Sequence, residues 1–333
     1  MTLTRSRADQ LISSFAGKRI LVLGDMMLDE FIWGKVRRIS PEAPVPVVEV
    51  ARESYHLGGA GNVASNIRAL GANPVPIGLI GDDHSAHRLS GLFQDGGIEP
   101  SGLVAEAGRP TTVKTRIVAH NQQIVRADRE NRTPLTSERN KALFAAFMKW
   151  LPTCVAVVVS DYDKGVVNRQ LLSEALPAAQ KAGIPVLLDP KVYQADYYQP
   201  ITLITPNQRE AELITGVSID DDRQLEVAGR QLLERFQCPY ALITRGEEGM
   251  SLFSREGSHH LPTFAREVFD VSGAGDTVIG TLALAIAAGA TMEESAILAN
   301  LAAGLVVGKV GTATVTQQEL LADFVSRNAH SSG

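Results

Sequence analysis

The residues best suited to chemistry lie in DVSGAGD, a segment that runs into a long apolar stretch. Its turn, Gly273, Ala274 and Gly275, lets the backbone approach a ligand closely, and the N–H groups that start the next helix attract an anion. Asp276 stands at that helix start, where the dipole stabilises a carboxylate. Transfer of a phosphoryl group to an alcohol needs an anion hole and a base of this kind. A glycine turn with a capping aspartate is the alternative without chemistry.

A second glycine-rich turn, Gly58 and Gly59, opens a helix that carries Asn62 and Asn66. The two amides are four residues apart and share a face, which suits the hydroxyls of a sugar. A tight turn with capping amides explains the same pattern. The segment is no P-loop, because no Gly-Lys-Ser/Thr follows it.

Carboxylates also follow the first buried strand, in LGDMMLDEF. Asp25 and Asp29 stand at its carboxyl end, where open α/β sheets bind ligands, so they can clamp sugar hydroxyls; turn and cap chemistry is the alternative.

Two further segments favour a metal ion and a nucleotide. Asn207 and Glu210 lie three apart at a helix start in TPNQREAEL, where they can act on one ion or its waters, or form a capping pair. LITRGEEGM places Gly246 and Gly249 in a turn that borders a nucleotide or forms a plain hairpin.

Composition excludes several other classes. The 333 residues are 44% hydrophobic and 21% charged with a net charge of -5, which fits a globular protein and gives no basic field for nucleic acid. Cys154 and Cys238 cannot form a disulfide framework or a zinc site. The run Thr277–Met292 is too short to span a membrane, so we expect a cytoplasmic protein. The first strand lacks GxGxxG, and the chain lacks a G-x-S-x-G elbow, which disfavours a nicotinamide dehydrogenase and a serine hydrolase.

The elements that must position these residues alternate between strands and helices, which predicts an α/β fold with a mostly parallel sheet. Expected strands are Arg19–Gly24, Val75–Gly81, Val155–Asp161, Pro185–Asp189, Ile201–Thr205 and Tyr240–Gly246, and expected helices include Asn62–Gly71, Arg169–Gly183 and Asp221–Phe236. Two segments, 41–55 and 111–130, alternate like antiparallel strands with one wet face. They predict a small projecting sheet that covers a site or pairs with a second subunit. The adjacent His259 and His260 are expected in a surface loop.

Together these motifs resemble the PfkB, or ribokinase-like, carbohydrate kinases over roughly Gly17 to Val325. The signatures are GGAGNVASNIRALG and DVSGAGDTVIG, with NQRE between them. The resemblance implies one kinase domain over residues 1–333, a ribokinase-like three-layer sandwich with lid strands within about 31–55 and 110–130. It also implies ATP and Mg²⁺, and a homodimer that forms through the lid strands.

A finer resemblance rests on RISPEAPVPVVEV, with GDMMLDEFIWG before it and DYDKG and DPK after it. These segments are similar to the kinases of ADP-heptose synthesis, which phosphorylate D-glycero-β-D-manno-heptose 7-phosphate at C1 for the lipopolysaccharide core. No nucleotidylyltransferase domain is expected after Gly333, so a separate phosphatase and a separate nucleotidylyltransferase would act downstream.

The resemblance also implies residue roles. Asp276 would be the base, with Gly273, Ala274 and Gly275 as the anion hole. The nucleotide side would comprise Asn207 and Glu210, which order Mg²⁺ through water, with Thr244, Arg245, Gly246 and Gly249 along ATP. The sugar side would comprise Asp25, Asp29, Gly58, Gly59, Asn62, Asn66 and Asp161. Asp270 and Ser272 match the family's loop for a monovalent cation such as K⁺.

The substrate's own phosphate needs a cationic partner, for which Arg37, Arg38, Lys114, Arg116 and Lys191 are the candidates. Lys114 and Arg116 alternate on one face of a lid strand and are the leading pair, with solvated lid charges as the alternative. Two other functions stay open: a related kinase for another sugar, and a sugar- or nucleotide-binding protein without catalysis. The second is disfavoured because a pure binder needs no base.

Overall fold

The computed structural model describes residues 3–120, 122–191, 195–265, 268–309 and 311–330. Within these ranges the main sheet has nine strands: β1 (Arg19–Gly24), β4 (Asn73–Gly81), β5 (Leu103–Glu106), β8 (Ala156–Ser160), β9 (Val186–Asp189), β10 (Leu203–Ile204), β11 (Tyr240–Thr244), β12 (Met250–Ser254) and β13 (Ser258–Leu261). Their order across the sheet is β13-β12-β11-β10-β9-β8-β1-β4-β5. Only the β11–β12 and β12–β13 pairs, at one edge, are antiparallel. The predicted mostly parallel sheet is confirmed.

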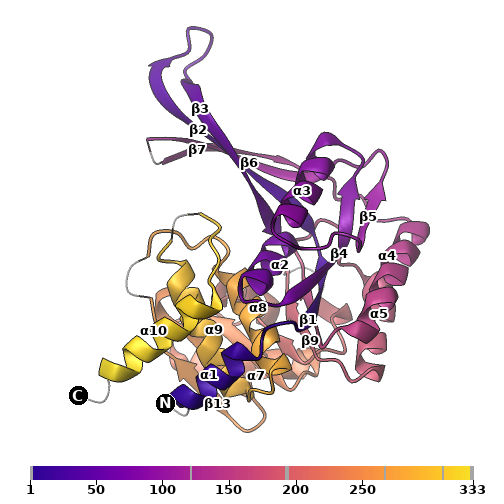
Figure 1. Ribbon diagram of the computed structural model, residues 1–333, viewed down its shortest axis with the longest axis vertical. Helices are drawn as coiled ribbons and strands as arrows, with labels where there is room; N and C mark the ends of the chain where they lie inside the picture. Colours follow the sequence, from indigo (N-terminus) through magenta and orange to yellow (C-terminus); the bar gives the residue numbers. More distant parts are fainter. Residues whose placement is uncertain (1–2, 121, 192–194, 266–267, 310, 331–333) are drawn as a thin grey trace.

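Helices cover both faces of this sheet, because alternate side chains of its strands are apolar on both sides. In β1, Ile20 and Val22 join one core cluster, and Leu21 and Leu23 join the other. The first cluster includes α1 (Arg5–Ser13), α2 (Ala60–Ala69), α3 (His84–Asp95), α8 (Ala274–Ala287), α9 (Met292–Val306) and α10 (Gln317–His330). The second includes α4 (Ser137–Trp150), α5 (Arg169–Lys181), α6 (Gln208–Thr215) and α7 (Asp222–Phe236). The result is a three-layer sandwich (Figure 1).

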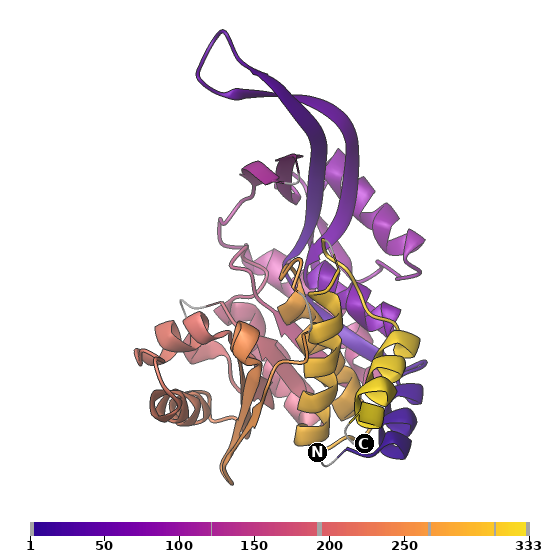
Figure 2. The same cartoon turned by 90° about the vertical axis from the view of Figure 1, so that its left-hand side faces the viewer.

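A second sheet projects from the body as a lid, seen at the top of Figure 1 and of Figure 2. Its described strands are β2 (Met26–Ile39), β3 (Pro46–Gly59), β6 (Thr112–Ala119) and β7 (Gln122–Arg129), in the order β3-β2-β6-β7. The lid is confirmed, but only Asp25 separates the end of β1 from the start of β2, and β3 runs directly into α2. Asp29, Gly58 and Gly59 therefore lie in strands at the root of the lid, where the sequence predicted loop and turn positions.

Three local expectations need comment. The predicted strand 201–205 shrinks to Leu203–Ile204, because Pro200 and Pro206 flank it and supply no backbone donor. His259 and His260 belong to the edge strand β13 instead of a loop, since an edge strand tolerates polar side chains on both faces. No helix in the described ranges is long and apolar enough to cross a bilayer.

Candidate active site

The carboxyl ends of the central parallel strands meet at one edge of the main sheet. The chain moves outward in opposite directions from β1, to β4 on one side and β8 on the other, which is where α/β sheets bind ligands. A cavity of about 200 Å³ lies at this edge. Its lining is Asp161, Tyr162, Asp189, Pro190, Lys191, Thr205, Asn207, Glu210, Thr244, Gly273, Gly275 and Asp276. Predicted site residues from five separate segments are thus brought together.

Asp276 is the buried carboxylate of this cavity, in the first turn of α8. Asn62 of α2 donates from Nδ2 to its Oδ2 at 2.7 Å, and the Tyr162 hydroxyl donates to its Oδ1 at 2.8 Å. Burial raises the pKa of Asp276 to about 6, although both hydrogen bonds act in the opposite direction. A carboxylate in this state is ionised at neutral pH and can still accept a proton, as a general base must.

The turn before Asp276 requires glycine at one position. Gly273 has φ +79°, and a Cβ added there would lie 2.5 Å from Asn62 Nδ2. The Ala274 N–H donates to the carbonyl of Val271 at 3.3 Å. Because the first N–H groups of a helix have no intrahelical partner, those of Gly275 and Asp276 are the candidate donors to an anion.

Asn207 and Glu210 form the start of α6 on the nucleotide side. The Glu210 N–H donates to Asn207 Oδ1 at 2.9 Å, and the Asn207 N–H donates to Glu210 Oε2 at 3.1 Å. The capping box that the sequence allowed is therefore present. Lys191 Nζ lies 3.1 Å from Glu210 Oε1, which places this lysine with the nucleotide residues, although it was predicted among the substrate residues.

The remaining predicted nucleotide residues surround the end of β11. Thr244 pairs with Asn207 and lines the cavity. The Arg245 guanidinium lies 3.7 Å from Asp222 of α7 and also pairs with Glu248. Gly246 begins the 3-10 helix η3 (Gly246–Glu248), and a Cβ at Gly249 would lie 2.1 Å from the Leu261 carbonyl oxygen. The predicted hairpin is confirmed, since β11 and β12 are antiparallel neighbours; contact with a nucleotide stays a prediction.

The root of the lid brings charged side chains over the same cavity. Asp29 pairs in register with Lys114, and Arg116 NH1 lies 2.8 Å from Asp29 Oδ1. Lys114 Nζ lies 5.7 Å from the centroid of the Tyr162 ring. A Cβ at Gly58 would lie 2.7 Å from Asp29 Oδ2, so this glycine leaves room for the carboxylate. The two leading cations therefore lie at the root of the lid near Asp29, and their contact with a substrate phosphate stays a prediction.

Two residues predicted to bind sugar are instead engaged inside the protein. The Asp25 carboxylate accepts the N–H groups of Tyr162, Lys164 and Val166 at 2.9, 3.1 and 3.0 Å. Asn66 donates to the Asn62 carbonyl at 2.9 Å and accepts from Thr277 Oγ1 at 2.8 Å, within the contact of α2 and α8. Their positions do not support contact with a sugar, because each buried polar group already has protein partners.

The loop before the glycine turn is held by Asp270. Its carboxylate accepts the N–H groups of Ser272 at 2.9 Å and Gly311 at 3.1 Å. Burial would raise the pKa of Asp270, but these hydrogen bonds outweigh it and lower the pKa. The described ranges contain no cluster of three or more His, Cys, Asp or Glu arranged to hold a metal ion. A monovalent cation at Asp270 and Ser272 stays a prediction.

Four residues of the cavity lining were not predicted from the sequence, Tyr162, Asp189, Pro190 and Thr205, and the first two are ionisable. Tyr162 follows Asp161 at the end of β8, and Asp189 ends β9. Burial and the charge of Glu210 raise the pKa of Asp189 well above its usual range, and burial with the charge of Asp25 raises that of Asp161 to about 7. Tyr162 and Asp189 both stand at carboxyl ends of predicted strands, which was the available signal.

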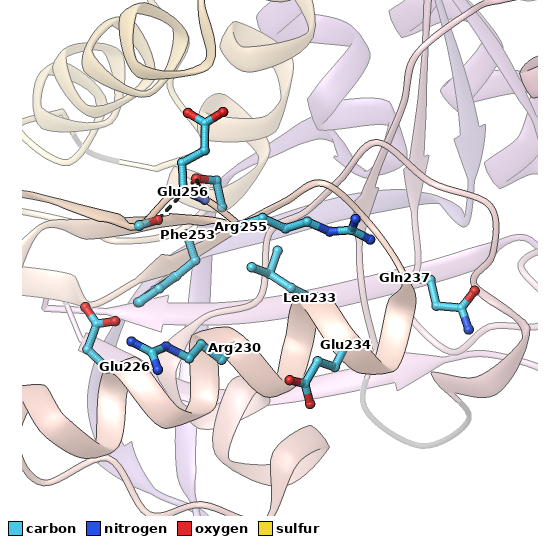
Figure 3. A pocket seen from close by; sticks show the side chains of 10 residues that line it. Glu226, Arg230, Leu233, Glu234, Gln237, Phe253, Arg255 and Glu256 are labelled. Carbon is cyan, nitrogen blue, oxygen red and sulfur yellow. Dashed lines mark hydrogen bonds between the residues drawn. The ribbon is translucent and has the colours of Figure 1, made fainter.

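A larger hollow of about 600 Å³ lies elsewhere, between α7 and the β12–β13 turn (Figure 3). Its residue Ser254 pairs with Tyr240, whereas Met250 pairs with Thr244 at the cavity of Asp276. The hollow therefore lies at the opposite end of β12. The guanidinium groups of Arg230 and Arg255 extend in opposite directions and do not converge on one ligand.

A parallel α/β body, a β lid and a buried carboxylate beside an anion-binding helix start define a phosphotransferase that acts on a small hydroxyl compound. The chain belongs to the pfkB family of carbohydrate kinases, whose model matches residues 18–319. It is a carbohydrate kinase.

Similar proteins agree with this assignment. The bifunctional protein HldE of Pelobacter propionicus is 46% identical over 322 residues, and that of Geobacter sulfurreducens 45% over 318 residues. Each alignment covers 95% of this chain and 65% of the relative, so the chain spans about 65% of their length. Arabidopsis thaliana ribokinase, solved with ribose and ATP, superposes with a TM-score of 0.74 at 19% identity over 92% of this chain and 98% of its own. Phosphofructokinase-2 of Escherichia coli, solved with potassium, gives 0.76 at 19% identity over 93% and 99%. The ribokinase-like fold is confirmed.

Proposed function

We propose that this kinase transfers the γ-phosphoryl group of ATP to the C1 hydroxyl of D-glycero-β-D-manno-heptose 7-phosphate. The observation that carries the proposal is the pair of lid cations near the proposed base: the charge of Lys114 acts on the buried Asp276, and Arg116 pairs with Asp29. A substrate that already bears a phosphate needs such cations as well as a base. The choice of heptose is supported by RISPEAPVPVVEV, which forms the outer part of β2 and β3, and by the HldE relatives.

In this reaction Asp276 accepts the proton of the attacking hydroxyl while the N–H groups at the start of α8 hold the transferred phosphoryl group. Asp29 accepts hydrogen bonds from sugar hydroxyls, and Lys114 and Arg116 hold the 7-phosphate. The lid excludes water, which would otherwise compete as acceptor. Little covalent chemistry is asked of the protein, because positioning and charge stabilisation dominate phosphoryl transfer.

Magnesium fits the nucleotide side of the cavity. Mg²⁺ prefers oxygen ligands and keeps several waters, and Glu210 Oε1 already has a cationic group, Lys191 Nζ, at 3.1 Å. Asn207 and Glu210 would order the ion through water, and when bound it would neutralise charge on the ATP phosphates. K⁺ beside Asp270 and Ser272 would shape the turn that forms the anion hole.

The product, a sugar 1,7-bisphosphate, suits a pathway to ADP-heptose for the lipopolysaccharide core. A phosphatase must then remove the 7-phosphate, and a nucleotidylyltransferase must activate C1. Because ATP and sugar phosphates are cytoplasmic metabolites, we place the reaction in the cytoplasm.

The test is release of ADP from Mg-ATP by the purified protein with four acceptors in parallel: the heptose 7-phosphate, ribose, fructose 6-phosphate and no sugar. Asp276→Asn runs beside the wild type. We expect release with the heptose phosphate alone, and a loss of about 10²- to 10⁴-fold in the variant with ATP binding retained. Release with another sugar would keep the kinase and replace the substrate. An active variant would overturn the role of Asp276.

A further inference from the structure

The loop between β8 and α5 contains a buried set of hydrogen bonds that the sequence motifs did not reveal. Three of its backbone N–H groups, at Tyr162, Lys164 and Val166, point to one carboxylate, that of Asp25 at the end of β1. Asp25 is 1% exposed, so these three hydrogen bonds are what make its burial tolerable. Three hydrogen bonds to one buried carboxylate fix the backbone of this loop. They therefore also fix the Cα positions from which its side chains extend.

The same loop is tied to the root of the lid. Lys164 Nζ lies 2.7 Å from Glu130 Oε2, immediately after β7, and Lys164 is only 9% exposed. Arg109, which precedes β6, donates to the Lys164 carbonyl at 2.8 Å. The loop is therefore held from the body by Asp25 and from both strands of the β6–β7 pair at the root of the lid.

The side chain that this loop delivers to the cavity is Tyr162. Its hydroxyl donates to Asp276 Oδ1 at 2.8 Å, while Asn62 donates to Oδ2 at 2.7 Å. Each carboxylate oxygen thus has one donor, and each keeps a second lone-pair site for a substrate hydroxyl. A carboxylate that accepts a hydrogen bond at each oxygen has a fixed orientation. In-line transfer requires a base that is oriented in this way.

We propose that Tyr162 is a positioning residue, which fixes the carboxylate of Asp276 together with Asn62 and is itself held in place by Asp25. The proposal deepens the proposed function and rests on Asp276 as its base. It gives Asp25 a role through the loop, in place of contact with the sugar. Lys114 of the lid lies over the Tyr162 ring, so the tyrosine stands between the base and the lid.

Donation by Tyr162 favours the ionised form of Asp276 and so lowers its pKa against the effect of burial. The other groups that act on Asp276 come from three elements. Asp29 of β2 raises its pKa, Lys114 of β6 lowers it, and Asp189 at the end of β9 interacts with it by charge. Loss of the tyrosine hydroxyl must therefore move the pKa of Asp276 upward from about 6.

The experiment removes only that hydroxyl, in Tyr162→Phe. Aspartate labelled with ¹³C at Cγ gives the titration of Asp276 by NMR, with its signal assigned by its absence in Asp276→Asn. We expect the midpoint to rise by about one unit, because the lost donor favoured the ionised carboxylate, and kcat to fall roughly tenfold. The acid limb of kcat/KM should move to higher pH in parallel.

Tyr55→Phe is the matched control, because Tyr55 also donates to a carboxylate, Glu53 Oε2 at 2.6 Å, but on the lid strand β3. It should leave the Asp276 midpoint unchanged. Asp25→Asn weakens the hydrogen bonds that hold the loop carrying Tyr162. It should therefore also raise the Asp276 midpoint. Melting curves report whether each variant is folded.

An unmoved Asp276 midpoint in Tyr162→Phe would overturn the proposal. So would a loss of activity that is equal at every pH, since a merely structural tyrosine would act in that way. The NMR titration needs no sugar and no turnover. It therefore decides on Tyr162 even if the acceptor panel shows that heptose 7-phosphate is not the substrate.

Discussion

At the residue scale, the surroundings of Asp276 give its carboxylate the properties that the proposed base needs. Burial raises its pKa to about 6, and the hydrogen bonds from Asn62 and Tyr162 oppose that rise. Proton transfer is most efficient when the pKa of the base lies near the working pH, which a carboxylate in water does not satisfy. The site therefore depends on Asn62 and Tyr162 as much as on the aspartate.

The raised pKa of Asp276 predicts that ionisation of this buried carboxyl lowers the free energy of unfolding. The folded protein binds a proton at Asp276 between about pH 4 and pH 6 that the unfolded chain releases, so its stability falls as pH rises through this range. Asp276→Asn removes the effect. Its free energy of unfolding should exceed that of the wild type by up to about 3 kcal/mol at pH 8 and by much less near pH 4.

Urea unfolding at the two pH values measures this difference. Asp9→Asn, an exposed position on α1, is the control for the removal of a carboxylate as such. If Asp276→Asn raised the free energy of unfolding equally at both pH values, the result would contradict a raised pKa of Asp276.

At the scale of elements, two helix starts build the part of the candidate site that surrounds Asp276. α2 begins at the end of the lid strand β3, and α8 begins at the glycine turn, and the two helices pack against each other. Asn62 lies in the first turn of α2 and Asp276 in the first turn of α8, so their contact depends on how closely the two starts approach. Gly273 permits that approach because it has no Cβ.

Gly273→Ala should break the hydrogen bond between Asn62 and Asp276. The new Cβ would lie 2.5 Å from Asn62 Nδ2 and would push the amide away from Asp276, so kcat should fall at least tenfold. Gly289→Ala is a matched control at the other end of α8. It has a similar φ of +83°, but no described heavy atom lies within 4 Å of the added Cβ.

Both alanine variants should lose about 1–2 kcal/mol of stability, because both place a Cβ in the left-handed region. Only Gly273→Ala should lose activity. Steady-state kinetics beside thermal melts distinguish the two effects, and equal kcat values would show that Gly273 is needed for its backbone conformation alone.

At the scale of the whole molecule, the lid is a four-stranded sheet whose outer strands, β3 and β7, pair with no further strand within the described chain. All eight residues of β7 are exposed, including Ile124 and Val125 at 38% and 48%. β3 exposes Val50 at the other edge of the same sheet. Open apolar edges favour pairing with another strand.

We therefore predict a homodimer that forms through the lid. Light scattering should give about twice 35.7 kDa, and the double variant Ile124→Glu, Val125→Glu should shift the protein toward the monomer. Val227→Glu, at an exposed apolar position on α7 in the body, is the control and should remain dimeric. A wild type that is monomeric at all concentrations would refute the prediction.

The sequence by itself determined the α/β class and the lid, and it singled out the aspartate that we propose as the base. Each of these is a local pattern: a run of apolar residues makes a strand, and DVSGAGD contains its glycine turn and its aspartate within seven residues. The capping pair of Asn207 and Glu210 and the shared face of Lys114 and Arg116 also depend only on residues near one another in the chain.

Only the tertiary structure decided which side chains meet Asp276. Tyr162 is 114 residues away from it and Asn62 is 214, and no periodicity states which strand end faces which helix start. The same limit misplaced Asp25, Asn66 and Lys191. Their residue types suit a sugar, but the three N–H groups around Asp25, the α2–α8 contact at Asn66 and the proximity of Glu210 to Lys191 engage them elsewhere. A residue's type fixes which bonds it can make, and the packing of distant elements fixes which partner is there to make them.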